Sequence, residues 1–243
     1  MAVQSMVQQA NEVRENKVTT IKTDTGEIKL SSKIVKAYLV AGGGNVSDQE
    51  VKLFIALCSA QKLNPFIKEA HLIKYGSSPA TMVVSKDVYQ KRADKHPEYQ
   101  GKKAGIIVLT AEGKIDYRVG TFYMPSREEL VGGWCEVYRK DREPERVEVS
   151  LDEYVGKKKD GTVNAQWSGK PATMIRKVAV AQCLREAFTS EFQGMYVPEE
   201  MGVEDTTSNF VVEETPQVHQ AIEANTAPTM QDIINEEKQA EKV

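Results

Sequence analysis

The chain has 243 residues, of which 40% are hydrophobic and 28% are charged, and its formal net charge is −3 at pH 7. These proportions exclude a wholly disordered chain, and the lack of a long apolar run excludes a bilayer-spanning helix. The cysteines at positions 58, 135 and 183 match no metal-binding or redox spacing, and the N-terminus lacks the apolar core of a signal peptide. We therefore expect a soluble cytoplasmic protein with reduced thiols.

Charge is distributed unevenly along the chain. Residues 201–243 contain nine acidic residues and two lysines, so the first 200 residues carry a net charge of +4. Because large apolar residues are rare beyond residue 200, we predict an acidic, largely disordered tail over 201–243. Ahead of it we predict a polar N-terminal arm over residues 1–30, with a short hairpin turned by residues 24–26, and a folded core over residues 31–200.

Helix signals dominate the first part of the core. Ser31 can cap a helix that runs to residue 40, and the three glycines at 42–44 stop it. This glycine run lacks the Gly-Lys-Ser/Thr of a phosphate-binding loop, so we interpret it as a flexible connection and expect no nucleoside triphosphate site. Ser47 and Glu50 form a capping box for a second helix, which Asn64-Pro65 ends.

Strand signals dominate the middle of the chain. HLIKY and ATMVV (residues 71–75 and 80–84) are predicted strands, and a helix is predicted over 87–95. Four more strand candidates follow, at residues 105–110, 115–123, 134–140 and 146–150. The expected fold is α+β: an antiparallel β-meander of three to four strands packed against a long C-terminal core helix, with an N-terminal helix and hairpin.

The long helix is predicted over residues 171–188, because Pro171 suits the first helical position and no other Pro or Gly follows. Four cations surround this apolar segment, and no acidic residue lies between Trp167 and Arg185. Lys177 and Arg185 are separated by about 12 Å along the helix, which suits two phosphates on one strand. We expect both side chains to be exposed and to contribute little to stability. The alternative is a core helix whose cations merely reach solvent.

Three blocks of the sequence carry a family resemblance: LFIALCSAQKLNPFIKEAHLIKY (residues 53–75), WCEVYRKDR (134–142) and the segment 164–196. Over about residues 45–200 they resemble the Bet family of phage single-strand annealing recombinases, which includes the lambda beta protein and is related more distantly to RecT. The resemblance implies ATP-independent binding of single-stranded DNA and annealing to a duplex during phage homologous recombination, in the bacterial host cytoplasm. It also implies a homo-oligomer, as a ring or helical filament, that works with a partner exonuclease and the host single-strand-binding protein.

The predicted DNA contacts are cations that can neutralise phosphates while leaving base edges free to pair. In decreasing order of preference they are Lys170, Arg176, Lys177 and Arg185; then Lys68, Arg139, Lys140 and Arg142; then Lys91 and Arg92. By resemblance, Lys68 and Arg185 match basic residues that the family is thought to use on DNA, whereas Ala172 and Val178 replace two residues that are basic in the lambda member. For each cation the alternative is an ordinary solvated residue, and Arg139 or Arg142 can instead pair with Asp141 or Glu143.

Aromatic and catalytic signals are sparse. Tyr89 and Trp167 are candidates for base stacking, although such side chains more often belong to a core. His71, His96 and His219 are scattered, without the partners of a metal ligand or general base, and we expect His71 to be structural. We therefore expect no catalytic residue, no metal site and no cofactor, and any Mg²⁺ would arrive with the DNA.

Three alternatives stay open. The first is a protein that protects single-stranded DNA without annealing it. The second, from a different class, is an α+β enzyme that depends on a nucleotide or a metal. The third is a scaffold protein whose basic helix meets an acidic partner.

Overall fold

The computed structural model describes residues 17–158 and 160–203 of the chain. All of the described residues belong to one compact unit. The first half of the predicted N-terminal arm, Lys159 and nearly all of the predicted acidic tail lie outside the described residues.

The N-terminal hairpin and its following helix are confirmed. Strands β1 (Thr19–Thr23) and β2 (Gly26–Leu30) pair antiparallel. The backbone N–H of Ile34 donates to the Ser31 hydroxyl at 3.2 Å, so Ser31 caps α2 (Ser32–Ile34) as expected. The helix continues as a π-helical turn, η1 (Val35–Leu39).

A small three-stranded sheet follows, in the order β3-β4-β5. Its strands are β3 (Val40–Ala41), β4 (Ala70–Ile73) and β5 (Thr81–Val84). Between β3 and β4 the chain forms α3 (Asp48–Ala60) and the 3₁₀ turn η2 (Pro65–Ile67). The interpretation of residues 42–44 as a flexible connection is wrong. The Gly44 N–H donates to the Lys74 carbonyl at 2.9 Å, and a Cβ on Gly42 would lie 2.6 Å from the same oxygen. Glycine is needed here because two backbones approach closely.

The predicted capping box at the start of α3 is present and extends further than expected. Glu50 accepts hydrogen bonds from the Ser47 N–H at 2.7 Å and from the Ala80 N–H at 2.9 Å. It also forms an ion pair with Lys74 at 2.8 Å. The hydrogen bond from Lys74 and those from the two amides lower the pKa of Glu50 to about 2. One carboxylate thus ties α3 to the β4-β5 hairpin.

The larger sheet is antiparallel and four-stranded, as expected, but it is not a meander. Its order is β7-β6-β8-β9, with β6 (Tyr99–Thr110), β7 (Ile115–Val119), β8 (Glu128–Arg139) and β9 (Glu145–Ser150). Strand β8 pairs with β6 instead of β7 because β6 and β8 are long and each has a buried central stretch, whereas β7 is short and has no buried residue. The short strand is therefore left at the edge.

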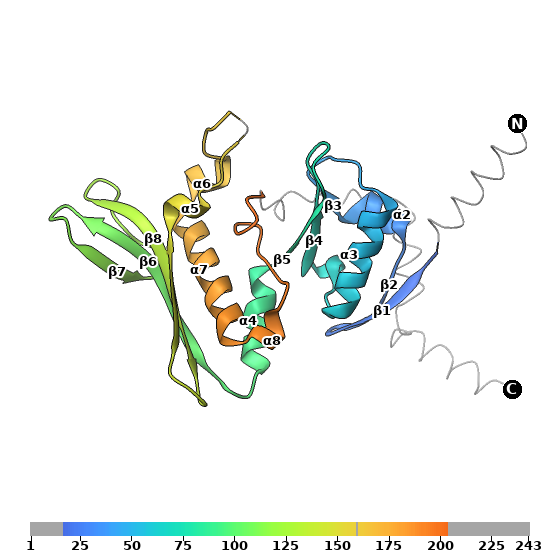
Figure 1. The fold of residues 1–243 in the computed structure, drawn as a ribbon, viewed down its shortest axis with the longest axis horizontal. Helices are drawn as coiled ribbons and strands as arrows, with labels where there is room; N and C mark the ends of the chain where they lie inside the picture. The colour runs from blue at the N-terminus through green and yellow to red at the C-terminus, as the bar shows by residue number, and fades with distance from the viewer. Residues whose placement is uncertain (1–16, 159, 204–243) are drawn as a thin grey trace, which may run out of the picture. The chain divides into compact units, whose positions relative to one another are not determined.

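The long helix α7 (Pro171–Ala187) covers one face of this sheet, as the sequence predicts, and contacts β6, β8 and β9 (Figure 1). A Cβ on Gly133 of β8 would lie only 2.7 Å from the Ile175 carbonyl of the helix, so glycine permits the close packing. Shorter helices complete the fold: α4 (Lys86–Lys95), α5 (Leu151–Tyr154), α6 (Ala165–Gly169) and α8 (Thr189–Phe192). The α+β class is confirmed.

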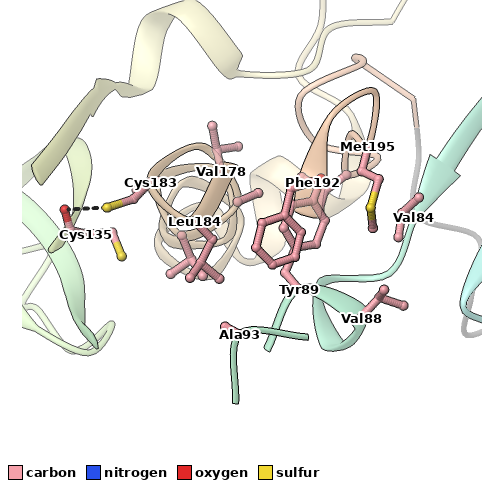
Figure 2. Close-up of a cluster of buried hydrophobic side chains, with 14 of the residues drawn as sticks. Val84, Val88, Tyr89, Ala93, Cys135, Val178, Cys183, Leu184, Phe192 and Met195 are labelled. Carbon is pink, nitrogen blue, oxygen red and sulfur yellow. Dashed lines mark hydrogen bonds between the residues drawn. The ribbon is translucent and has the colours of Figure 1, made fainter. Parts of the chain in front are cut away.

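The core between α4, α7 and α8 contains one of the predicted stacking residues. Figure 2 shows the Tyr89 ring lying against Phe192, with centroids 5.1 Å apart, beside Leu184 and Met195. On the sheet side, the Cys183 thiol donates to the Cys135 carbonyl at 3.4 Å. Tyr89 and Trp167 are both buried, so each belongs to the core and presents no ring face to solvent.

Candidate nucleic-acid interface

A cavity of about 580 Å³ brings together predicted contacts from three distant parts of the chain. Lys68 follows η2, Lys91 lies on α4 and Lys177 lies on α7, and all three line this cavity. In the order of preference predicted from the sequence, Lys177 belongs to the first group, Lys68 to the second and Lys91 to the third. Lys86 lines it as well, so four lysines face one space, together with the carboxylates of Glu69, Asp87 and Glu199.

The corner that carries Lys68 is fixed by its own hydrogen bonds. The Asn64 side chain accepts from the Phe66 N–H at 3.0 Å, and Pro65 begins the 3₁₀ turn. Lys68 then adopts a left-handed conformation with φ of 63°, which reverses the chain and directs Glu69 inward. The buried Glu69 carboxylate accepts from the Asn64 N–H at 2.9 Å. Lys68 is thereby held, with an exposed side chain, where the helix meets strand β4.

Helix α4 contributes its N-terminus and two lysines, Lys86 and Lys91, to the cavity wall. Ser85 caps this ten-residue helix, and residues 85–88 all line the cavity. The first N–H groups of a helix give its N-terminus a partial positive charge, which adds to the field of the lysines. One turn further on, Lys91 forms an ion pair with Glu69 at 2.7 Å. The acidic residue thus neutralises part of the field.

Lys177 is not the exposed cation that the sequence suggests. Its ammonium lies 2.7 Å from the Glu199 carboxylate, and the two side chains are 16% and 3% exposed, respectively. Glu199 belongs to segment 193–203, which follows α8 and returns along α7. The prediction of an exposed Lys177 is wrong because an acidic partner 22 residues away in the sequence occupies it. Its role in DNA binding stays a prediction.

Arg185 is held in the same way by the next residue of that segment. Its guanidinium binds both carboxylate oxygens of Glu200, at 2.6 and 3.1 Å, and donates to the Met195 carbonyl at 3.1 Å. It also stacks over the Tyr196 ring. The Arg185 side chain is 19% exposed and that of Glu200 is 4% exposed, so the expectation of an exposed Arg185 is wrong as well.

The other cations of α4 and α7 lie apart from the cavity lining. Arg92 donates to the Glu191 carbonyl at 3.1 Å and to the Gln61 carbonyl, and so links α4 with α8 and the end of α3. Arg176 donates to the Ala104 carbonyl of β6 at 3.4 Å. Lys170, at the start of α7, is exposed and has no ion pair with any described residue.

The predicted cations of the YRKDR block are held at the end of β8 and do not line the cavity. Arg139 pairs with both oxygens of Asp141 at 2.7 Å and donates to the Ala187 carbonyl at the end of α7. Arg139 holds the pKa of Asp141 at about 2. Arg142 also reaches Asp141, at 3.3 Å, and Lys140 donates to the Pro97 carbonyl at 2.8 Å. The alternative of pairing with Asp141 is confirmed for both arginines.

Several residues of the cavity lining were not among the predicted site residues, and Lys86, His71 and Glu199 are examples. Lys86 is the first residue of α4, a position that no periodicity marks. His71 is buried, and its Nε2 lies 3.1 Å from the Lys68 carbonyl, which agrees with the expected structural role. Glu199 stands between Pro198 and a second glutamate, and nothing in this local sequence marks a site. Only the fold brings Glu199 to α7.

The chemistry of this cavity suits the binding of an anion better than catalysis. Four lysines and a helix N-terminus outweigh three carboxylates, which favours a phosphodiester. Within residues 17–158 and 160–203, no group of three histidine, cysteine or acidic residues is placed to hold a metal ion. In the same part of the chain, no helix has the length and apolar character needed to cross a membrane.

Comparison with known proteins adds one match. A family model described as the RecT family matches residues 12–213, which is most of the chain and includes every element described above. A search of curated proteins found no match.

Proposed function

Because the chain belongs to the RecT family, whose members bind single-stranded DNA and anneal it in recombination, we propose that it anneals complementary strands without ATP. In this proposal it acts in phage homologous recombination, in the cytoplasm of a bacterial host. It performs no covalent chemistry and needs no cofactor, and Mg²⁺ enters only with the DNA.

The observation that carries the proposal is the convergence of Lys68, Lys91 and Lys177 on one cavity with the N-terminus of α4. Two complementary strands repel each other through their phosphates, so a protein that aligns them must neutralise backbone charge. It must also leave the base edges free to pair. Lysines suit this task because an ammonium contacts phosphate as a point charge and reads no sequence.

Base pairing itself supplies the free energy of annealing, so nucleotide hydrolysis has no step to drive. The one glycine-rich run, residues 42–44, packs against the Lys74 carbonyl and lacks a following Lys-Ser/Thr. It therefore has neither the sequence nor the open loop of a phosphate-binding loop. Both features support an ATP-independent reaction.

Assembly into a homo-oligomer, as a ring or helical filament, is part of the proposal, because one cavity can hold only a short stretch of a long strand. Strand β7 supports it: among the described strands it pairs with β6 alone, and its other edge is unpaired. Val119 is 72% exposed and Phe122, in the next loop, is 76% exposed. An unpaired apolar edge is a surface on which a second copy can pack. A partner exonuclease and the host single-strand-binding protein complete the proposed assembly.

Mixing complementary oligonucleotides with purified protein, in buffer without nucleotide, tests this function. An annealing protein speeds duplex formation above the spontaneous rate, and a purely protective protein binds the strands and slows it. A nucleotide-dependent enzyme changes nothing until nucleotide is added, and a scaffold protein does not bind the strands. Any of the last three results would refute the proposal.

A further inference from the structure

We propose that Glu199 is a built-in competitor of DNA: its carboxylate occupies Lys177 in the free protein, and a phosphodiester of the bound strand displaces it. This inference rests on the proposed function, and it assigns to the cavity a regulatory residue that carries the same negative charge as the ligand.

The position of Glu199 distinguishes it from an ordinary helix-surface partner. Its side chain lies within ion-pair distance of Lys177 and lines the same cavity as Lys68 and Lys91. A carboxylate at 3% exposure is costly to bury unless a cation compensates it. Here the compensating cation is one that the sequence marks as a phosphate contact. The carboxylate therefore stands where a strand phosphate would bind.

The neighbouring residue, Glu200, makes a different set of contacts. It binds Arg185 through both oxygens and accepts a hydrogen bond from the Val197 N–H at 3.1 Å, and it does not line the cavity. Through these contacts Glu200 stabilises the turn at residues 197–200 and attaches it to Arg185 of α7. Of these two successive glutamates, Glu200 holds the backbone of the turn, whereas Glu199 pairs with Lys177 and lines the cavity.

Exchange requires little movement of the chain. Upstream, the Val84 N–H of β5 donates to the Tyr196 carbonyl at 2.8 Å, and downstream Glu200 is fixed to Arg185. Between these two attachments only Pro198 and Glu199 reach the cavity lining. Rotation of the Glu199 side chain away from Lys177 therefore breaks this ion pair without detaching segment 193–203.

The charge balance of the cavity makes the exchange favourable only when DNA is present. Its lining holds four lysines and three carboxylates, so loss of Glu199 alone would leave a larger uncompensated positive charge. A phosphodiester carries the same single negative charge as a carboxylate and restores the balance. Competition of this kind weakens the hold on each strand, which suits annealing because a strand must be released into the duplex.

The direct test is Glu199→Gln, which removes the charge and keeps the shape. Binding of a fluorescent single-stranded oligonucleotide should tighten several-fold at low salt. Unchanged or weaker binding by a folded E199Q protein would overturn the inference.

Two comparisons make the result specific. In the Lys177→Gln background the gain from E199Q should vanish, because the two residues act through one contact. A gain that persists there would show only a general effect of charge, and it would also overturn the inference. Glu200→Gln is the matched control, since it removes an adjacent carboxylate of equal burial; it should lower the melting temperature without tightening binding, and tighter binding would contradict the separate roles.

Carbon-13 NMR of the wild-type protein decides the matter if E199Q fails to fold. On addition of oligonucleotide, the side-chain carboxyl resonance of Glu199 should shift as its ion pair with Lys177 breaks, while that of Glu200 stays in place. An unmoved Glu199 resonance, with DNA bound, would refute the competitor role. A wild-type protein that binds no single-stranded DNA at all would instead refute the proposed function.

Discussion

Replacing Arg185 with alanine should destabilise the fold strongly, which an exposed cation would not do. Alanine removes the two hydrogen bonds to Glu200, the bond to the Met195 carbonyl and the stacking on Tyr196. It also leaves the Glu200 carboxylate buried without its cation. Loss of one partner of a buried ion pair costs about 3–5 kcal/mol. Each kcal/mol lowers the melting temperature of a domain of this size by about 2–4 °C, so we expect a fall of about 10 °C.

Thermal unfolding followed by circular dichroism measures this effect. Lys170→Ala is the matched control, because Lys170 is an exposed cation on the same helix and its loss should change stability by no more than about 0.5 kcal/mol. The double change Arg185→Ala with Glu200→Ala should recover part of the loss, because it removes the buried charge as well as its partner. An R185A protein that melts within about a degree of the wild type would refute the anchoring role of this pair.

Three further predictions follow from the core and from α3. Val178→Asp should leave the protein unfolded at 25 °C by circular dichroism, because Val178 is fully buried and an unpaired carboxylate there has no partner. Gly133→Val should lower the melting temperature by several degrees, since its Cβ must displace the Ile175 carbonyl of α7; an unchanged melting temperature would show that the helix can shift freely. Glu50 has a pKa lowered from 4.5 to about 2 in the folded state, so its contribution to stability is complete above pH 4.5 and is lost as the pH falls from 4.5 towards 2. Glu50→Gln should therefore flatten the pH dependence of the melting temperature in that window, and an unchanged slope would contradict the assignment.

Most of the secondary structure could be predicted because its signals are local. Ser31, the Ser47–Glu50 capping box and Pro171 each satisfy or remove backbone groups within one helical turn, and each begins a helix in the structure. The strand order of the larger sheet could not be predicted in this way. The choice of β6 over β7 as the partner of β8 depends on pairing between residues far apart in the sequence, and no turn signal records it.

The candidate site was predictable in its cations but not in their partners. Composition and resemblance identify Lys68 and Lys177, because cations suited to phosphate remain visible in the sequence. No acidic residue lies between Trp167 and Arg185, so the sequence of α7 gives its cations no acidic partner. Glu199 and Glu200 come later in the chain, and the turn after α8 brings them back to Lys177 and Arg185. Burial of an ion pair is a tertiary property, so the expectation of exposed side chains failed for this physical reason.

Charge reversal at the cavity tests whether single-stranded DNA binds there. The variant Lys68→Glu with Lys86→Glu changes two exposed lysines of the lining, and Lys29→Glu with Lys114→Glu makes the same change in charge at exposed sites elsewhere. Binding of single-stranded DNA is measured for both across a range of salt concentrations. The cavity variant should bind far more weakly, with a slope of log affinity against log salt that is shallower by about 1.4 for two lost phosphate contacts, while the control should retain nearly wild-type binding. Equal losses in the two variants, or full binding by the cavity variant, would show that the DNA lies elsewhere on the protein.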